Sequence, residues 1–466
     1  MNAASRKRVV VFIDHDMTIR HFVKSRAFAE LERDFEVTYV VNLDPHPTGQ
    51  WVNTEPESLG FERLRVVNIP RRRMGEWYKL YAVSLLQKQR GTANYKARKE
   101  RMATVNGWRR TLTYEALSLP GIFPLYRRRY LERMGEYEPL RRLIEEEKPD
   151  LCLYPSMLTG YFMNELMLLC PKLGIPFVVL MNSWDNPSQK AMVTGTPDRL
   201  VVWGEHTKRH AMEFMRLAED RIEVFGAAQF QVYREPVTDS RAELCAMFGV
   251  PDDGLPVVLY AGVSKSINET RHLQLLDAAI EAGRVPPCRV LYRPHPWRGE
   301  LVEGELNFFE AGLKHITMDP WMEEYYRRVV VNPSASFEMA DYNITRKLLG
   351  LVAGSISTLS TIQLETVLVG KPTISFMPKS DMETKYGKSA AISQRLAHFV
   401  DLWTAPGVIS VDDDADLPAA VRRLLEEAKD PELAARIRAV GNEFAVLDGP
   451  TYGERLNGLV HELAGG

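Results

Sequence analysis

Short apolar runs that alternate with helical patterns constrain the fold of this chain more than any other feature. Each run is long enough for one strand that is covered on both faces of a sheet. Amphipathic segments such as 24–33 and 137–148 separate most of the runs, which is typical of repeated βα units in a parallel sheet. In the first half, the predicted strands are 9–13, 37–41, 64–69, 151–154, 177–181, 199–203 and 222–225.

The same alternation begins again after a polar segment at 232–255, so we predict two Rossmann-like, doubly wound α/β domains with a cleft between them. A chain of 466 residues is long enough for two cores. We expect 1–240 to form the first domain and 241–466 the second, closed by the C-terminal helices. The predicted elements of the second half are strands 257–261, 289–292, 350–353 and 373–377 and helices 416–428, 431–445 and 452–464.

Composition excludes several classes of protein. A hydrophobic fraction of 45% with 26% charged residues is typical of a folded globular protein. Neither a signal peptide nor a membrane-spanning run is evident, so we expect a cytoplasmic protein. The cysteines form no CxxC pair and are expected to be small buried residues rather than zinc ligands or disulfides: Cys152, Cys170, Cys245 and Cys288.

Residues 71–133 depart from this pattern because they hold 16 lysines and arginines against four glutamates, a net charge of +12 in a chain of net charge −2. One interpretation is a solvated helical insertion. The other is a surface on which basic and aromatic side chains bind anionic lipid headgroups or an acidic glycan acceptor. Nucleic acid is not expected, because no recognisable RNA- or DNA-binding module accompanies the charge. The aromatic residues of the segment include Trp77, Tyr78, Tyr81, Trp108, Phe123, Tyr126 and Tyr130.

Ligands of open α/β sheets bind beyond the carboxyl ends of the strands, so polar residues in those loops are candidate ligand contacts. After strand 257–261, Gly262 allows close backbone approach, and Ser264 and Ser266 could meet a phosphate. After strand 289–292, Arg293 and His295 stand beside prolines that restrict the backbone. A rigid turn with an incidental histidine is the competing interpretation.

The most informative loop of the second half follows the strand that we predict at 350–353. Ser357 and Thr358 lie in a polar turn, and Ser360 and Thr361 are predicted in the first turn of the next helix, where unpaired N–H groups attract anions. Glu365 follows four residues after Thr361, on the same side of that helix. Hydroxyl groups near phosphate and a carboxylate that accepts from ribose hydroxyls together predict a nucleotide site.

Residues 255–376 resemble the donor-binding domain of GT-B glycosyltransferases and their relatives, which include CDP-glycerol glycerophosphotransferases and bacterial sialyl- and capsule transferases. The shared HP motif corresponds to His295-Pro296, and the two-hydroxyl motif to Ser360-Thr361. The resemblance implies that these residues contact the phosphates or base of a nucleotide. An aspartate often found shortly before the serine pair is replaced here by Ser357-Thr358, and no signature of a particular sugar is evident.

The acceptor side is predicted in the first half. Trp184, Asp185, Asn186 and Lys190 resemble a WDN-then-Lys segment of some GT-B-like proteins of surface polysaccharide pathways, although a plain turn is the competing interpretation. We treat these four residues as lining the cleft.

The loop after strand 9–13 offers a candidate general base. Displacement at an anomeric carbon needs a group that takes the proton of the acceptor hydroxyl, and His15 or Asp16 could do so with Asp14 orienting the histidine. The competing interpretation is that Asp16 only caps the following helix. We expect no metal, so Arg293 and Lys265, hydroxyl groups and helix dipoles would meet the charge of the leaving diphosphate.

Three functions follow from these patterns. The leading hypothesis is a glycosyltransferase, or a related phosphotransferase, that moves a sugar or polyol phosphate from a CMP-, CDP-, UDP- or GDP-linked donor to a surface-glycan or lipid-linked acceptor. Such an enzyme would work at the inner face of the membrane. A non-hydrolysing UDP-sugar 2-epimerase and a non-catalytic GT-B-like binding subunit are the alternatives.

Overall fold

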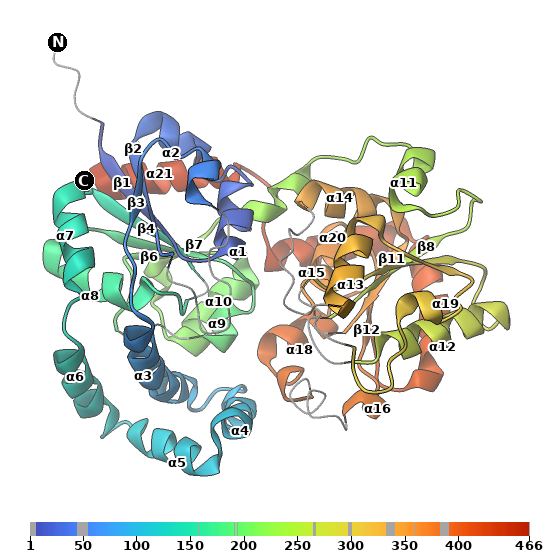
Figure 1. Ribbon diagram of the computed structural model, residues 1–466, viewed down its shortest axis with the longest axis horizontal. Helices are drawn as coiled ribbons and strands as arrows, with labels where there is room; N and C mark the ends of the chain where they lie inside the picture. The colour runs from blue at the N-terminus through green and yellow to red at the C-terminus, as the bar shows by residue number, and fades with distance from the viewer. Residues whose placement is uncertain are drawn as a thin grey trace. The chain divides into compact units, whose positions relative to one another are not determined.

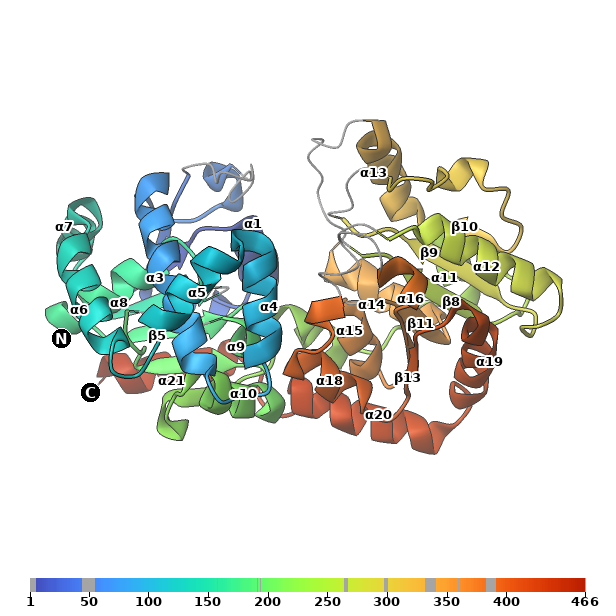
Figure 2. The ribbon, with the colours of Figure 1, turned by 90° about the horizontal axis from the view of Figure 1, so that it is seen from below.

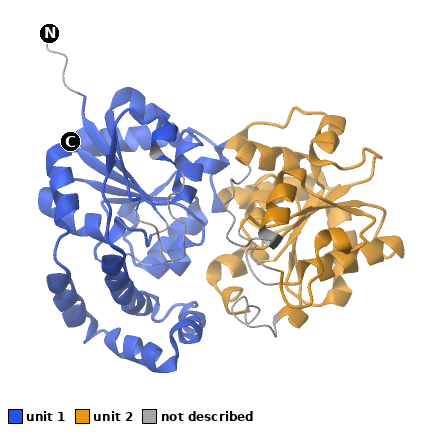
Figure 3. Ribbon diagram, viewed as in Figure 1, with its two compact units in different colours: residues 1–231, 444–466 blue, residues 232–443 orange. Residues whose placement is uncertain are grey.

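The computed structural model describes residues 6–43, 55–156, 158–190, 192, 194–263, 267–296, 301–331, 341–358, 360–382 and 391–465. The chain forms two compact units. Unit 1 comprises residues 1–231 and 444–466, and unit 2 comprises residues 232–443 (Figure 3).

Unit 1 is built on a parallel sheet whose seven described strands have the order β3-β2-β1-β4-β5-β6-β7 (Figure 1). The apolar runs form it because every residue from Val9 to Ile13 is buried, as expected for strands covered by helices on both faces. The strands are β1 (Arg8–Ile13), β2 (Glu36–Val41), β3 (Leu64–Val66), β4 (Leu151–Ser156), β5 (Phe177–Met181), β6 (Arg199–Val202) and β7 (Ile222–Val224). The helices of this unit outside the 71–133 segment are α1 (Asp16–Thr18), α2 (Ala29–Asp34), α7 (Glu138–Glu147), α8 (Met163–Leu173), α9 (Asn186–Gln189), α10 (Glu205–Met215) and α21 (Tyr452–Gly465).

The basic segment is a group of helices attached to unit 1: α3 (Arg71–Gln89), α4 (Tyr95–Asn106), α5 (Trp108–Leu117) and α6 (Phe123–Met134) (Figures 1 and 2). We call this group the helical insertion. Its first helix is fixed to α8 by Glu165, a fully buried carboxylate that accepts from the Arg73 guanidinium at 2.5 and 2.8 Å and from Trp77 Nε1 at 2.6 Å.

The aromatic residues of the insertion divide into two groups. Trp77 and Tyr130 are buried within it, whereas Tyr78 and Trp108 are 58% and 57% exposed. Trp77 and Tyr130 therefore supply part of the core that this group of helices needs, and only the exposed aromatic side chains are open to a ligand.

Unit 2 repeats the architecture with six described parallel strands in the order β10-β9-β8-β11-β12-β13. Both sheets thus have the strand order of a Rossmann-like fold, and the predicted fold class is confirmed. The strands are β8 (Val257–Ala261), β9 (Arg289–Arg293), β10 (Ile316–Met318), β11 (Gly354–Ser357), β12 (Thr373–Phe376) and β13 (Val408–Val411). The longer described helices are α11 (Arg241–Phe248), α12 (Glu269–Glu281), α13 (Pro320–Val331), α14 (Tyr342–Leu351), α15 (Ile362–Leu368), α18 (Ala397–Trp403), α19 (Leu417–Glu427) and α20 (Pro431–Phe444).

The division into units differs from the predicted boundary after residue 240. The chain divides after Gln231, and its last segment returns to unit 1. Helix α21 lies beside α2, because Tyr452 and Leu456 are buried in the core formed by β1, β2 and β4. The side chain of Asn457 also donates to Asp34 Oδ2 at 2.8 Å. The C-terminal helices therefore do not all close the second domain.

One predicted strand of unit 2 is also wrong. Residues 350 and 351 end helix α14, and the strand follows at Gly354–Ser357. These residues are helical because Leu348, Leu349 and Leu351 form the buried face of α14. The short strands β10 and β13 were not predicted, because Thr317 and Ser410 interrupt their apolar runs.

Two further expectations can be compared with the structure. The four cysteines are free and buried, as predicted. None of the helices among the described residues is long and apolar enough to cross a membrane.

Candidate functional site

The candidate site of unit 2 is at the carboxyl edge of its sheet. Ala261, the last residue of β8, pairs in register with Arg293 of β9 on one side and with Ser357 of β11 on the other. β8 and β11 are the neighbours from which the strand order runs in opposite directions, and ligands of open α/β sheets bind at such a switch point. The loops that follow Arg293, Ala261 and Ser357 therefore leave the sheet side by side.

A buried carboxylate shapes the loop after β8. Glu269 accepts from the backbone N–H of Val263 at 2.7 Å and from the Tyr292 hydroxyl at 2.6 Å. A Cβ atom on Gly262 would lie 2.6 Å from Glu269 Oε2, so the glycine is required by this carboxylate. The sequence analysis did not single out Glu269. The only signal for it was its position directly after Asn268, the N-cap of α12. Ser264, Lys265 and Ser266 lie outside the described residues.

Arg293 is held in place at the end of β9. Its Nε lies 3.3 Å from Asp319 Oδ2, and its Nη1 donates to Thr345 Oγ1 at 3.2 Å. Burial raises the pKa of Asp319, and the neighbouring charge of Arg293 opposes that effect. His295 follows, partly exposed, two residues further along the loop. Asp319 was missed because it follows the unpredicted strand β10.

The turn from β11 to α15 contains two buried polar atoms that lack a partner among the described residues. They are the hydroxyl oxygen of Ser357 and Oε1 of Gln363, whose Nε2 donates to the Ser357 carbonyl at 2.9 Å. A buried polar atom without a partner costs about 1–3 kcal/mol, so native proteins usually satisfy it with water or a ligand. These two atoms mark a place where polar groups of a ligand would be bound.

The other hydroxyl residues of this turn lie nearby. Thr358 is buried, and Ser360 and Thr361 are partly exposed. Helix α15 starts at Ile362 with Thr361 as its N-cap, and the Thr361 side chain makes no capping hydrogen bond. The two residues thus precede the first helical turn, in which we had placed them.

Glu365 is largely buried and has a partner within unit 2. The Tyr233 hydroxyl donates a hydrogen bond to Glu365 Oε2. Burial and the Glu365 charge raise the pKa of Tyr233 far above its usual range, so the phenol stays protonated as a donor. A ribose bound at Glu365 would share this carboxylate with Tyr233.

Lys371, in the Gly370-Lys371-Pro372 turn between α15 and β12, binds backbone carbonyl groups at the end of α14. Its ammonium group donates to the carbonyl groups of Leu349 and Val352 at 2.5 Å and of Gly350 at 3.2 Å. Burial lowers the pKa of Lys371 to about 8. Lys371 therefore closes the end of helix α14, and it does not belong to the candidate site.

In unit 1, Asp14 is a buried carboxylate at the end of β1. It accepts from the Tyr154 hydroxyl and from the backbone N–H of Tyr161 at 2.5 Å. A side chain at Gly160 would overlap both Asp14 and Tyr154, so the loop after β4 is built around this contact. Burial raises the pKa of Asp14 to about 6, and the two hydrogen bonds oppose the increase. The partners that the structure shows for Asp14 are thus in β4 and its loop, not in His15.

His15 and Asp16 begin helix α1. His15 is the N-cap, and its Nδ1 accepts from the backbone N–H of Met17 at 2.9 Å. A neutral imidazole that accepts at Nδ1 carries its proton on Nε2. Asp16 is the first helical residue and is partly exposed. The predicted capping role of Asp16 is thus taken by His15.

The WDN segment is a folded turn rather than an open one. Trp184 is buried, with its ring centroid 6.0 Å from that of Phe444. Asn186 is also buried, and its Oδ1 accepts from the backbone N–H of Ser183 at 3.1 Å. Asp185 and Lys190 are partly exposed. Of the four residues predicted on the acceptor side, only these two reach the surface.

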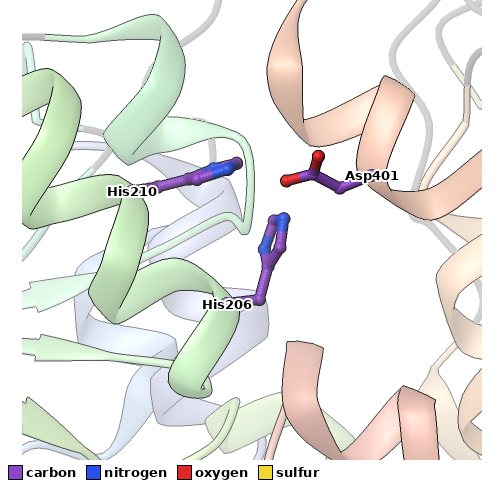
Figure 4. A group of neighbouring side chains, drawn as sticks. All are labelled: His206, His210 and Asp401. Carbon is purple, nitrogen blue, oxygen red and sulfur yellow. The ribbon is translucent and has the colours of Figure 1, made fainter.

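Two buried histidines that we did not predict lie one turn apart on α10. The side chains of His206 and His210 are neighbours (Figure 4), with ring centroids 4.0 Å apart. The His206 centroid is 4.1 Å from that of Phe444. Their spacing of four residues on one helix was visible in the sequence, but an i, i+4 pair alone does not separate a core contact from a ligand set.

Comparison with solved structures identifies the fold. The UDP-GlcNAc 2-epimerase from Neisseria meningitidis bound to UDP-GlcNAc is 12% identical over 98% of this chain and 100% of that chain, with a TM-score of 0.51. The UDP-GlcNAc 2-epimerase from Methanocaldococcus jannaschii is 12% identical over 98% of this chain and 99% of that chain, with a TM-score of 0.50. The protein thus shares the GT-B fold of these two structures. No family model matches the sequence, and no curated protein matches it.

Proposed function

We propose that the protein is a glycosyltransferase, or a closely related phosphotransferase, that moves a sugar or polyol phosphate from a nucleotide-activated donor to a surface-glycan or lipid-linked acceptor. The observation that carries the donor half of this proposal is the pair of unsatisfied atoms, Ser357 Oγ and Gln363 Oε1, at the switch point of unit 2. Arg293 ends the strand on the other side of β8 and offers a fixed positive charge to a diphosphate.

The donor contacts follow from this geometry. The guanidinium of Arg293, oriented by Asp319 and Thr345, would stabilise the charge that develops on the leaving phosphate. His295, Ser360 and Thr361 would complete the phosphate contacts, as the family resemblance implies. Glu365 would accept from the ribose while Tyr233 holds its other side. No step in this account needs a metal ion.

We assign the general base to Asp16 rather than His15. The acceptor atom of the His15 ring, Nδ1, is already used by the Met17 N–H, so the exposed edge of a neutral ring presents a donor. Asp16 would take the acceptor hydroxyl proton as that oxygen attacks the anomeric carbon and the donor bond to phosphate breaks. Asp14 would act by positioning the loop, because its carboxylate is bound to Tyr154 and Tyr161. Replacing Asp16 by Asn is expected to abolish turnover but leave donor binding unchanged, and unchanged turnover would rule Asp16 out.

The helical insertion supports an acceptor at an anionic membrane. Exposed apolar residues lie on α5, on α6 and in the turn between them, where Arg109, Arg110, Arg128 and Arg129 are also exposed. Apolar side chains that enter the interface and arginines that bind headgroups together are typical of peripheral membrane proteins. The apolar residues are Trp108, Leu112, Leu119, Ile122 and Leu125.

A thermal-unfolding screen tests the donor site. CMP, CDP, UDP and GDP are added separately, and one of them is expected to raise the unfolding midpoint, since a ligand at 100 times its Kd stabilises a protein by about 2.7 kcal/mol. The variant Ser357→Ala, with Ser410→Ala on the exposed position of β13 as its matched control, is expected to reduce the shift. If no nucleotide shifts the midpoint, the donor site is wrong.

Two outcomes would select the alternatives. Conversion of UDP-GlcNAc to a new sugar nucleotide without any acceptor would identify an epimerase. Nucleotide binding without turnover on any acceptor extract would favour a binding subunit.

The membrane part of the proposal has its own test. Wild-type protein is expected to sediment with vesicles that contain phosphatidylglycerol and to be released at high salt. The double variant Trp108→Ser/Leu112→Ser is expected to stay in solution, and binding that equals the wild type would contradict the proposed surface.

A further inference from the structure

Helix α4 of the insertion carries a buried arginine that has no ion-pair partner among the described residues. Arg98 is 7% exposed, and its Nε and Nη2 are buried without a hydrogen-bond partner in the described part of the chain. A buried guanidinium is costly unless it is paired, because it has lost its hydration. Packing within the insertion does not offset the cost of burying the Arg98 guanidinium.

Two more cations lie beside Arg98. Arg101 is one turn further along α4, and Lys190 follows helix α9. The Arg101 Nη1 donates to Gln189 Oε1 at 3.3 Å, and the Tyr81 hydroxyl donates to the Gln189 carbonyl at 3.4 Å, so α3 and α4 both contact α9 (Figure 2). Burial, with the nearby charges of Arg98 and Arg101, lowers the pKa of Lys190, although the Asp185 charge opposes the shift.

The acidic residue of this cluster is already engaged. Asp185 accepts from Gln189 Nε2 at 2.7 Å, from the Ser183 hydroxyl at 2.5 Å and from Asn186 Nδ2 at 3.4 Å. In the described part of the chain, the hydrogen bonds that the Asp185 side chain accepts all come from neutral groups. Three cations thus stand against one carboxylate, which leaves two positive charges uncompensated in a partly buried place.

We propose that Arg98, Arg101 and Lys190 form a binding site for a phosphate group of the acceptor. Two uncompensated positive charges match a phosphate ester or diphosphate, and guanidinium groups bind such oxyanions through paired N–H donors. Placing this ligand on the acceptor rests on the proposed transferase function. Binding of a phosphate group at the site does not, because it depends on the cluster alone.

Neutral hydrogen bonds, rather than the cationic cluster, hold the start of α4 in place. Gln89 Nε2 and Asn94 Nδ2, which bracket the turn before α4, both donate to the Ser188 carbonyl, at 2.8 and 3.0 Å. These buried bonds hold the start of α4 against α9 without using a charge. The cations at the site therefore remain available for a ligand.

Titration calorimetry with inorganic pyrophosphate tests the site on the full chain. Wild-type protein is expected to bind, and Arg98→Met and Lys190→Met are each expected to weaken binding by about tenfold or more, the loss typical of a charged hydrogen bond. Lys96→Gln removes an exposed charge of the same helix α4 and is the matched control, with no expected change. Absence of binding to wild type, or equal binding by Arg98→Met, overturns the site.

Thermal unfolding without ligand separates a binding role from a structural one. Arg98→Met removes an unpaired buried charge and puts an apolar side chain of similar volume in its place. The unfolding midpoint is therefore expected to rise by about 2–4 °C. A structural arginine would instead give a lower midpoint, and that result would overturn the proposal.

The site can fail independently of the proposed function. His295→Ala is expected to lose the nucleotide shift and to keep the part of the pyrophosphate binding that depends on Arg98, whereas Arg98→Met is expected to do the reverse. If a nucleotide raises the unfolding midpoint but pyrophosphate binding does not depend on Arg98, the proposed transferase function is retained and this phosphate site is overturned. Vesicles of phosphatidylcholine with phosphatidic acid distinguish the source: Arg98-dependent binding to them identifies a lipid-borne phosphate, and Arg98-dependent binding of pyrophosphate alone identifies a soluble one.

Discussion

The hydroxyl of Tyr233 donates a hydrogen bond to Oε2 of Glu365, and Tyr233 lies at the start of unit 2. The contact connects the segment that enters this unit with helix α15 of the candidate site. Tyr233 also packs against the cluster that contains Leu348 and Leu349 of α14. The carboxylate predicted to bind ribose is thereby held by a residue far from it in sequence.

Replacing Tyr233 by Phe tests this contact. A hydrogen bond to a charged acceptor contributes about 1.5–3 kcal/mol, so the free energy of unfolding of unit 2 is expected to fall by that amount. Urea unfolding measures the change, and Tyr78→Phe, which alters an exposed hydroxyl, is the control that should stay near zero. Equal stability of the Tyr233 variant and the wild type would show that the bond is not formed in solution.

Gly262 is predicted to tolerate no side chain. The Cβ atom of an alanine there would lie 2.6 and 2.9 Å from the two oxygens of Glu269, and moving that carboxylate would break its bonds to Val263 and Tyr292. Gly262→Ala is therefore expected to lower the free energy of unfolding by about 1–3 kcal/mol.

The matched control for that substitution is Gly75→Ala. Gly75 lies inside helix α3, and no atom would lie within 4 Å of its Cβ. The control is expected to be stabilising by about 0.5–1 kcal/mol, because alanine loses less backbone entropy than glycine in a helix. A Gly262 variant that matches this gain would contradict the close approach of Glu269.

The fold could be predicted from the sequence because buried parallel strands leave a plain signal. Runs such as 9–13 and 257–261 are continuous, apolar and separated by helical patterns, and both formed strands. Strand β11 was misplaced because GSIS is polar: its Ser355 is buried by hydroxyl bonds to Thr366 and Thr373 at 2.9 and 2.7 Å. A pattern of hydrophobicity cannot reveal a strand that is buried through hydrogen bonds.

The candidate site was predictable only where a residue directly follows a strand. The rule led to Arg293, which ends β9, and to the loop at Gly262, whereas Ser357 ends a strand that the sequence had misplaced. Glu269 and Asp319 could not be, because their importance comes from contacts with Tyr292 and Arg293 that the fold alone creates. The packing of α21 on unit 1 could not be predicted for the same reason, because the pattern of an amphipathic helix does not indicate which sheet it covers.

Asp14 gives unit 1 a stability that depends on pH. Burial raises its pKa from 3.8 to about 6 in the folded protein. Between these values the folded state holds a proton that the unfolded state has lost, so the contribution is fully present below about pH 4 and is lost as the pH rises through 6. A difference of about two pKa units corresponds to about 3 kcal/mol.

The variant Asp14→Asn isolates this effect. Burial also lowers the pKa of His21 to about 3, which favours folding as the pH rises over part of the same range, but that contribution is common to both proteins. The free energy of unfolding of the wild type, relative to that of Asp14→Asn, is expected to fall by about 3 kcal/mol between pH 4 and pH 7. Urea unfolding of both proteins at each pH measures this difference. A difference that does not change with pH would show that Asp14 ionises normally in the folded protein.

Leu456 tests the assignment of α21 to unit 1. Its side chain is fully buried in the core that contains Val9, Tyr39 and Leu151, so Leu456→Ala is expected to cost about 2–5 kcal/mol of the stability of unit 1. Hydrogen exchange followed by mass spectrometry should show faster exchange in β1 and β4, with β8 and β11 of unit 2 unchanged. Gly458→Ala, on the exposed side of the same helix, is the control and should leave exchange in β1 as it is. Faster exchange in β8 instead of β1 would mean that the helix stabilises unit 2, as the sequence alone had led us to expect.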